Sequence, residues 1–255
     1  MRINTNVSAL TSSRNVFLNN MNARSSMAKL SSGMRISQAS DDAAGLSIAN
    51  KLRTQARSLN QAATNAEQGR AMLQIAEGAA QTVQGFVERQ KELMVQRDQT
   101  ATNSSVTATL AAEITSLQTE ADRVVAEANF QGSSVFGSLV FQVSDRASNG
   151  TVTIDASLAL VTLTGASTLA NADSALDSVN SALARIGVGQ NVLDYTTRNL
   201  KSAVVNVRAA ESTIRDVDMA EEMANFTRSN ILMQAAESML SQANQSSQSI
   251  LNILR

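Results

Sequence analysis

The residues best suited to chemistry are two adjacent carboxylates, Asp41 and Asp42, in the segment KLSSGMRISQASDDAAGLSIANKLRTQ, residues 29–55. A pair of acids can serve general acid–base catalysis or hold a divalent cation. Adjacent side chains on a helix, however, point about 100° apart and converge poorly on one ion. No other acid or histidine lies in the fifteen residues before them, and the next acid along the chain is Glu67. The pattern therefore argues against a metal site.

The composition removes most other catalytic chemistry. The chain contains no cysteine and no histidine, so it has no thiolate, no disulfide and no imidazole base or metal ligand. An enzyme would have to depend on carboxylates, lysine or serine. We therefore expect no catalytic residues, no metal ligands and no cofactor.

Charge and hydropathy narrow the choice of partner. The 21 basic and 22 acidic residues give a net charge of −1, without a lysine- or arginine-rich run, so we expect no nucleic-acid partner. No apolar run approaches the roughly 18 residues needed to cross a bilayer, and we expect no membrane partner. The opening MRINTNVSALTSS has no apolar core, so a cleaved secretory signal is not expected.

The acidic pair has a simpler interpretation as part of a connector. Side chains there can accept hydrogen bonds from the free amides of a helix that opens at Ala43, and a negative charge suits the helix dipole. Small residues on both sides favour a connector between two helices. Its predicted functional positions are Gly33, Ser40, Asp41, Asp42 and Gly45.

Heptad spacing predicts long helical rods over residues of about 45–99, 105–129 and 172–214. The first alone would extend about 80 Å at 1.5 Å per residue. The seams are Leu52, Ala56, Leu59, Ala63, Ala66, Leu73, Ala76, Ala80, Val83, Val87 and Met94; Leu110, Ile114, Leu117, Ala121, Val124 and Ala128; and Leu176, Val179, Leu183, Ile186, Leu193, Leu200, Val204, Val207 and Ile214.

Between the second and third rods the period changes to that of strands. Two β-branched runs flank Asn149-Gly150, a strong hairpin signal, and residues 157–167 are a further extended candidate. We expect a β-hairpin region over about 135–165. The predicted fold is mainly α: long antiparallel rods form a coiled-coil bundle with a small β-hairpin, and the terminal helices pair as a coiled coil.

Both ends of the chain carry apolar stripes that bury too little area alone to offset the cost of ordering them. We expect the ends to pair with each other and with neighbouring copies, as a terminal domain of residues 1–44 and 215–255 beside a rod domain of 45–214. The predicted assembly residues are Ile3, Val7, Leu10, Phe17 and Met21, with Met219, Met223, Phe226, Leu232, Met239, Leu240, Ile250, Leu251 and Leu254.

Four segments carry a family resemblance: RINTNVSAL, LSSGMRISQASDDAAGLSIANKLRTQ, ANFQG, and the tail from STIRDVDMAEEMANFTRSNIL to ILNILR. They resemble bacterial flagellin, the filament subunit, over both terminal thirds and in the same order. The resemblance implies a minimal flagellin without variable outer domains, which polymerises into the helical filament used for swimming. It places the terminal coiled coil in the filament core and makes the connector a spoke to the rod.

The same resemblance implies partners and a location. The partners are other copies of the chain, an export chaperone and the export apparatus, and the filament cap and hook-junction proteins. The location is the extracellular flagellar filament, reached without a cleaved signal peptide.

A further implied partner is the vertebrate receptor Toll-like receptor 5. The segment VERQKELMVQ, residues 87–96, is similar to the flagellin segment that this receptor recognises: Arg89 and Leu93 match its arginine and leucine, and Glu113 its acidic partner. Arg89 and Leu93 are one helical turn apart, so we expect an exposed charge beside an exposed apolar side chain. Counting from the turn at 100–105 predicts that Glu113 lies at nearly the same height on the next helix.

Two alternatives stay open. A hook–filament junction protein shares the terminal helices, but that family usually lacks the complete block from Leu30 to Gln55. An enzyme built on carboxylates or serine in a helical bundle would need convergent polar groups in a concave site, whereas the sequence predicts rods.

Overall fold

The structure, a computed structural model, describes residues 5–99, 103–144 and 150–253, without the side chains of 247 and 250–253. It consists of two compact units, each described here by itself. The terminal unit holds residues 1–54 and 207–255, and the rod unit holds residues 55–206. The predicted Ile3 and Leu254 lie outside the described residues.

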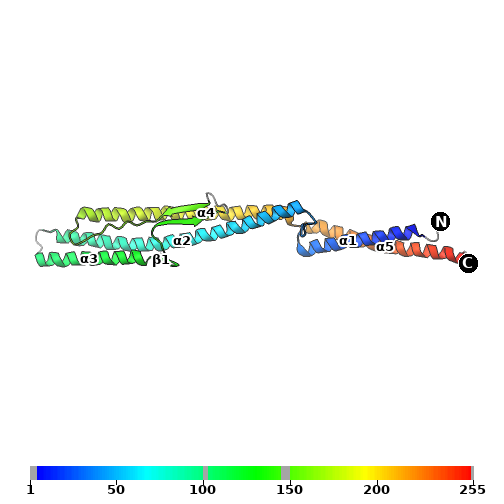
Figure 1. The fold of residues 1–255 in the computed structure, drawn as a ribbon, viewed down its shortest axis with the longest axis horizontal. Coiled ribbons are helices and arrows are strands. Elements are labelled where there is room, and N and C mark those ends of the chain that lie inside the picture. Colours follow the sequence, from blue (N-terminus) through cyan, green and yellow to red (C-terminus); the bar gives the residue numbers. More distant parts are fainter. Residues whose placement is uncertain (1–4, 100–102, 145–149, 254–255) are drawn as a thin grey trace. The chain divides into compact units, whose positions relative to one another are not determined.

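The terminal unit contains an antiparallel pair of helices, α1 (Val7–Ser32) and α5 (Met219–Ile253), which lie side by side in Figure 1. The amide Nδ2 of Asn6 donates to the carbonyl of Ala243 at 3.0 Å, and that of Asn20 to the sulfur of Met233 at 3.5 Å. Because the residue number rises on one helix while it falls on the other, the two run in opposite directions. The predicted pairing of the terminal helices is confirmed.

The rod unit is built from most of α2 (Ala43–Arg97), all of α3 (Ser104–Glu127) and most of α4 (Leu169–Arg215). Lys201 of α4 contacts Glu67 of α2 at 2.8 Å, and the α2 side chain of Lys91 contacts Asp173 near the start of α4 at 2.6 Å. These pairs show that α2 and α4 are antiparallel. The prediction of a mainly helical fold built from antiparallel rods is confirmed.

The units divide after residues 54 and 206, about ten residues further into the rod than the predicted limits at 44 and 215. The reason lies in the first turns of α2 and the last turns of α4. Arg53 Nε pairs with Glu211 Oε1 at 3.0 Å, and both residues belong to the terminal unit. Because α2 and α4 each continue through the boundary between the units, their heptad spacing does not change there and does not reveal its position.

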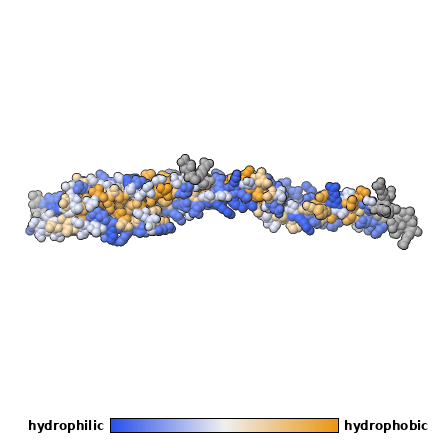
Figure 2. All heavy atoms as spheres, viewed as in Figure 1, coloured by the Kyte–Doolittle hydropathy of each residue, from blue (hydrophilic) through white to orange (hydrophobic). Residues whose placement is uncertain are grey.

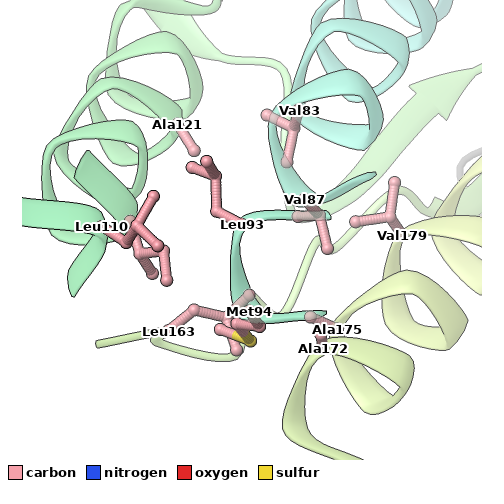
Figure 3. Close-up of a cluster of buried hydrophobic side chains, with 11 residues drawn as sticks. Val83, Val87, Leu93, Met94, Leu110, Ala121, Leu163, Ala172, Ala175 and Val179 are labelled. Carbon is pink, nitrogen blue, oxygen red and sulfur yellow. The ribbon is translucent and has the colours of Figure 1, made fainter. Parts of the chain in front are cut away.

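The predicted heptad seams form the core of the rod. Alanines predominate along the first half of the α2 seam, with Leu59 and Leu73 among them, and valine and methionine follow. Figure 3 shows one part of this core, where side chains from α2, α3 and α4 meet the chain at Leu163. The buried seam residues include Ala66, Leu73, Ala76, Ala80, Val83, Val87, Met94, Leu110, Ile114, Ala121, Val179, Ile186, Leu193, Leu200 and Val204.

A β-hairpin lies where the period changes. Strands β3 (Ser138–Gln142) and β4 (Thr151–Asp155) pair antiparallel, with Val140 opposite Thr153. The predicted turn at Asn149 lies outside the described residues. Shorter strands, β1 (Asn129–Phe130) and β2 (Ser133–Ser134), form a second hairpin directly after α3.

The extended candidate at residues 157–167 forms no strand. This segment instead packs against the helices: Leu163 is fully buried, and its N–H donates to the Gln118 side chain at 3.1 Å. This extended candidate therefore has no strand partner, and at Leu163 a glutamine of α3 accepts the backbone hydrogen bond.

The β3–β4 hairpin rests on two helical glycines. A Cβ atom added to Gly69 of α2 would lie 2.9 Å from the ring of Phe141, and one added to Gly189 of α4 would lie 2.5 Å from Ile154 Cγ2. Phe141 and Ile154 are inward-facing residues of β3 and β4. The glycines therefore let the hairpin side chains approach both helices closely. In exchange, each glycine lowers the stability of its helix, because glycine has a low helix propensity.

Alanine substitution of two α4 glycines tests whether the hairpin needs this close approach. A Cβ on Gly187 meets nothing within 4 Å, so Gly187→Ala should stabilise the protein by about 0.5–1 kcal/mol through helix propensity. Gly189→Ala gains the same propensity but must displace Ile154, which should cost about 1–3 kcal/mol by overpacking. Urea unfolding followed by circular dichroism measures both. Equal stabilisation by the two substitutions would show that the hairpin does not need the glycine.

Candidate functional site

The contact face of α1 consists mostly of small and polar side chains. Its shielded positions recur with alternating steps of three and four residues, as in a coiled coil. Ala23 and Ser26 are the most buried among them. These positions are Ala9, Ser12, Val16, Asn19, Ala23, Ser26 and Leu30.

The contact face of α5 follows the same spacing with somewhat larger side chains. Phe226 and Leu240 are half-buried in it, and Ala236 is its most buried residue. Its shielded positions are Glu222, Phe226, Ser229, Met233, Ala236, Leu240 and Ala243.

The outward faces of this pair, in contrast, carry large apolar side chains. Most of the predicted assembly residues lie there, between 47% and 70% exposed. Figure 2 shows hydrophobic surface over the described part of these two helices. The exposed residues are Val7, Leu10, Phe17, Met21, Met219, Met223, Leu232 and Met239.

The predicted stripes are therefore mostly not the seam through which the helices pair. Of the predicted set, Phe226 and Leu240 contribute to the seam, while Ile250 and Leu251 lie in α5 with undescribed side chains. The α1 seam was missed because a search for apolar residues passes over alanine, serine and asparagine. Its 3–4 spacing was the signal available in the sequence.

The two acids of the connector between α1 and α2 accept hydrogen bonds from different backbone amides. Asp42 Oδ1 accepts from the N–H of Gly45 at 2.9 Å, at the start of α2. Asp41 Oδ2 accepts from the N–H groups of Ser37 and Gln38 at 3.1 and 3.0 Å. The Gln38 and Ser37 amides hold the pKa of the Asp41 carboxyl below its usual value, because they stabilise its charged form.

The other predicted connector residues also have identifiable contacts. Gly33 ends α1 with a left-handed φ of 68°, and its N–H donates to the carbonyl of Lys29 at 2.8 Å. A side chain at Gly45 would collide with the Asp42 carboxylate. Ser40 bonds the side chain of Gln38 at 3.4 Å and not the helix amides.

The connector also joins the end of α4. Met34 and Asp216 form a β-bridge, and the Arg35 N–H donates to the carbonyl of Arg215 at 2.7 Å. The Arg35 guanidinium donates to the carbonyl of Ile214 at the same distance. Over the described ranges, no three acidic side chains lie together as a metal site would require. The acidic pair acts here on backbone amides.

The structure brings two of the three predicted receptor residues together at the surface. Arg89 Nη2 of α2 lies 3.8 Å from Glu113 Oε1 of α3, and about half of each side chain is exposed. The predicted equal height of these residues is confirmed. Arg89 also donates to Glu92 at 2.9 Å.

The expectation that Leu93 is an exposed apolar side chain is wrong. Leu93 is 1% exposed and points toward Ala121 of α3 (Figure 3). A spacing of four residues places Arg89 and Leu93 on adjacent parts of one helix face, but α3 covers only the leucine. The helix crossing decides this exposure, and the spacing alone does not contain it.

Among the described residues, no helix is both long and apolar enough to cross a membrane. Two family models match the chain: the bacterial flagellin N-terminal helical region over residues 3–139, and the bacterial flagellin C-terminal helical region over residues 169–254.

Curated relatives match over their whole length and over the whole of this chain. Flagellin of Halalkalibacterium halodurans is 39% identical, and flagellin of Bacillus subtilis is 36% identical. The flagellar filament 33 kDa core protein of Treponema phagedenis is also 36% identical, again over 100% of both chains. Together with the paired terminal helices and the antiparallel rods, these matches show that the chain belongs to the bacterial flagellin family and is a structural subunit of the flagellar filament.

Proposed function

We propose that copies of this chain join through the outward apolar faces of α1 and α5. One observation carries the proposal: the seam between these helices consists largely of small and polar residues, while most of the large apolar side chains face away from it. A patch of this kind on a soluble chain marks an interaction site.

The distribution of exposed side chains over the described residues supports this choice of surface. All the exposed leucines, methionines and phenylalanines among the described residues belong to the terminal unit. The exposed large apolar residues described in the rod unit are Ile75, Tyr195 and six valines: Val95, Val106, Val140, Val188, Val192 and Val205. The rod unit therefore shields its described leucine, methionine and phenylalanine side chains from solvent, whereas the α1–α5 pair leaves several of its own exposed.

Burial by a neighbouring copy would remove this apolar area from water. The outward residues of α1 and α5 differ from each other, so contact between unlike faces of successive copies gives a heterologous interface. Heterologous contacts that do not close into a ring generate helical filaments. The proposed role needs no catalytic group, in keeping with a sequence that lacks cysteine and histidine.

Removing the outward apolar side chains should block growth without unfolding the monomer. In the variant Phe17→Ser, Met223→Ser, Leu232→Ser, each position is 47–64% exposed, so about half of the usual 1.5–3 kcal/mol per buried side chain is lost. The critical concentration for assembly should rise at least about thirtyfold, since 1.4 kcal/mol is a factor of ten. Sedimentation of polymer against monomer measures it.

A matched control uses polar positions on the same two helices. Asn15→Ser, Asn22→Ser and Gln234→Ser also alter exposed residues, and they should leave the critical concentration nearly unchanged. Circular dichroism should show the same helix content for both variants. Normal assembly of the apolar-face variant would refute the proposed interface.

We also propose that Toll-like receptor 5 binds the monomer at Arg89 and Glu113. The two side chains lie 3.8 Å apart across α2 and α3 and are half exposed, which suits a charged contact point. Leu93 then contributes indirectly: it is buried in the core between α2 and α3 and so helps to hold Arg89 and Glu113 in place.

Receptor activation by single variants separates these two roles. Arg89→Ala should weaken activation at least about tenfold with unchanged stability, since truncating an anchor commonly costs 2 kcal/mol or more. Leu93→Ala should weaken activation together with a loss of about 2–5 kcal/mol of folding stability. Arg123→Ala, at another exposed ion-paired arginine, is the control. Reporter-cell dose responses and urea unfolding are the readouts, and equal potency of Arg89→Ala and wild type would exclude this site.

The flagellin resemblance further implies an export chaperone, the export apparatus, the filament cap and hook-junction proteins as partners. We propose these partners, and export without a cleaved signal peptide, on that resemblance alone. Co-purification of the chain with each candidate partner tests them individually.

A further inference from the structure

The methionines are distributed unevenly over the molecule. The chain has ten, and eight of them fall in the terminal unit. The two in the rod unit, Met72 and Met94, are 8% and 0% exposed. The rod therefore shields its thioethers from solvent.

Five methionines of the terminal helices are open to solvent in the single chain. They lie on outward positions of α1 and α5, with exposed fractions between 48% and 62%. These residues, called the exposed methionine set below, are Met21, Met27, Met219, Met223 and Met239.

We infer that the exposed methionine set is an oxidation site for peroxides, and that its oxidation prevents assembly of the monomer. The inference rests on the proposed assembly surface, to which Met21, Met219, Met223 and Met239 belong. It adds a chemical modification that acts on that surface.

The reaction is a two-electron transfer of oxygen. The thioether sulfur attacks one peroxide oxygen, an S–O bond forms and the O–O bond breaks. The other oxygen leaves as water after proton transfer when the oxidant is hydrogen peroxide. Each flexible apolar side chain becomes a polar sulfoxide.

The consequence follows from where these sulfurs lie. A sulfoxide oxygen in a dry contact between copies would be a buried acceptor without a partner, which is unfavourable. In the monomer the same oxygen is hydrated, because these side chains face solvent and not the α1–α5 seam. Oxidation should therefore leave the helices intact and act only on contacts between copies.

Peroxide treatment followed by peptide mass spectrometry tests the site. In the monomer, the exposed methionine set should oxidise at least about tenfold faster than Met72 and Met94, since susceptibility follows exposure. Assembled filament should protect the set. Oxidised monomer should show an unchanged circular dichroism spectrum and a critical concentration at least about tenfold higher, and methionine sulfoxide reductases of both stereospecificities should restore assembly.

A variant in which all five members are replaced, Met21→Leu, Met27→Leu, Met219→Leu, Met223→Leu and Met239→Leu, nearly conserves volume and apolar character. It should assemble equally well before and after peroxide. The matched control, Met72→Leu with Met94→Leu, should remain as sensitive as the wild type.

Several results would overturn the inference. These are normal assembly of oxidised wild type, no recovery after reductase treatment, loss of helix content on oxidation, or equal peroxide sensitivity of the five-leucine variant and wild type. Failure here is distinguishable from failure of the assembly surface. If the Phe17→Ser, Met223→Ser, Leu232→Ser variant cannot assemble while oxidised monomer can, only the oxidation inference falls.

Discussion

The pairing of α1 with α5 through small side chains is the constraint on which the rest of the terminal unit depends. Alanine and serine at the shielded positions of α1 leave little room in the seam for a larger side chain. Phe17, one position after the seam residue Val16, and Met21, which lies between Asn19 and Ala23, are therefore directed outward. The result is a helix pair that leaves large apolar side chains at its surface, where the proposed function places the contacts with other copies.

The rod unit solves the same problem internally. Leu73, Met94 and Ile114 are fully buried, and the seams of three antiparallel helices supply their neighbours. A buried polar network adds specificity to the packing: Gln90 donates to the carbonyl of Ile114 at 3.0 Å, and Gln118 accepts from the Leu163 N–H. These directional bonds require α2, α3 and the segment 157–167 to meet in one register. Apolar contacts alone specify that register less strictly.

Within the terminal unit, the connector is held by hydrogen bonds to backbone groups. Asp41 organises the turn itself, and Asp42 supports the first turn of α2. Arg35 reaches the last carbonyls of α4, so the entry to one long helix is tied to the exit from the other. Two adjacent acids that suggest catalysis in isolation thus serve to fix the chain between helices.

Much of the architecture was present in the sequence. Heptad spacing determined the long helices and most of the rod core, because a repeat of apolar residues every three to four positions can be buried only along a helical seam. The strand pair followed from alternating β-branched residues on both sides of Asn149-Gly150. The family resemblance rested on the residues of both chain ends, and the full-length matches confirmed it.

The tertiary structure decided which of several possible faces is covered. It placed small residues of α1 in the seam and directed Phe17 outward, and it buried Leu93 while Arg89 stayed at the surface. It also showed that the extended candidate at 157–167 packs against the helices without a strand partner, with its Leu163 N–H bonded to Gln118. The physical reason is common to all three. Periodicity describes a helix or strand relative to its own axis, whereas burial depends on the angle and register at which another element approaches it.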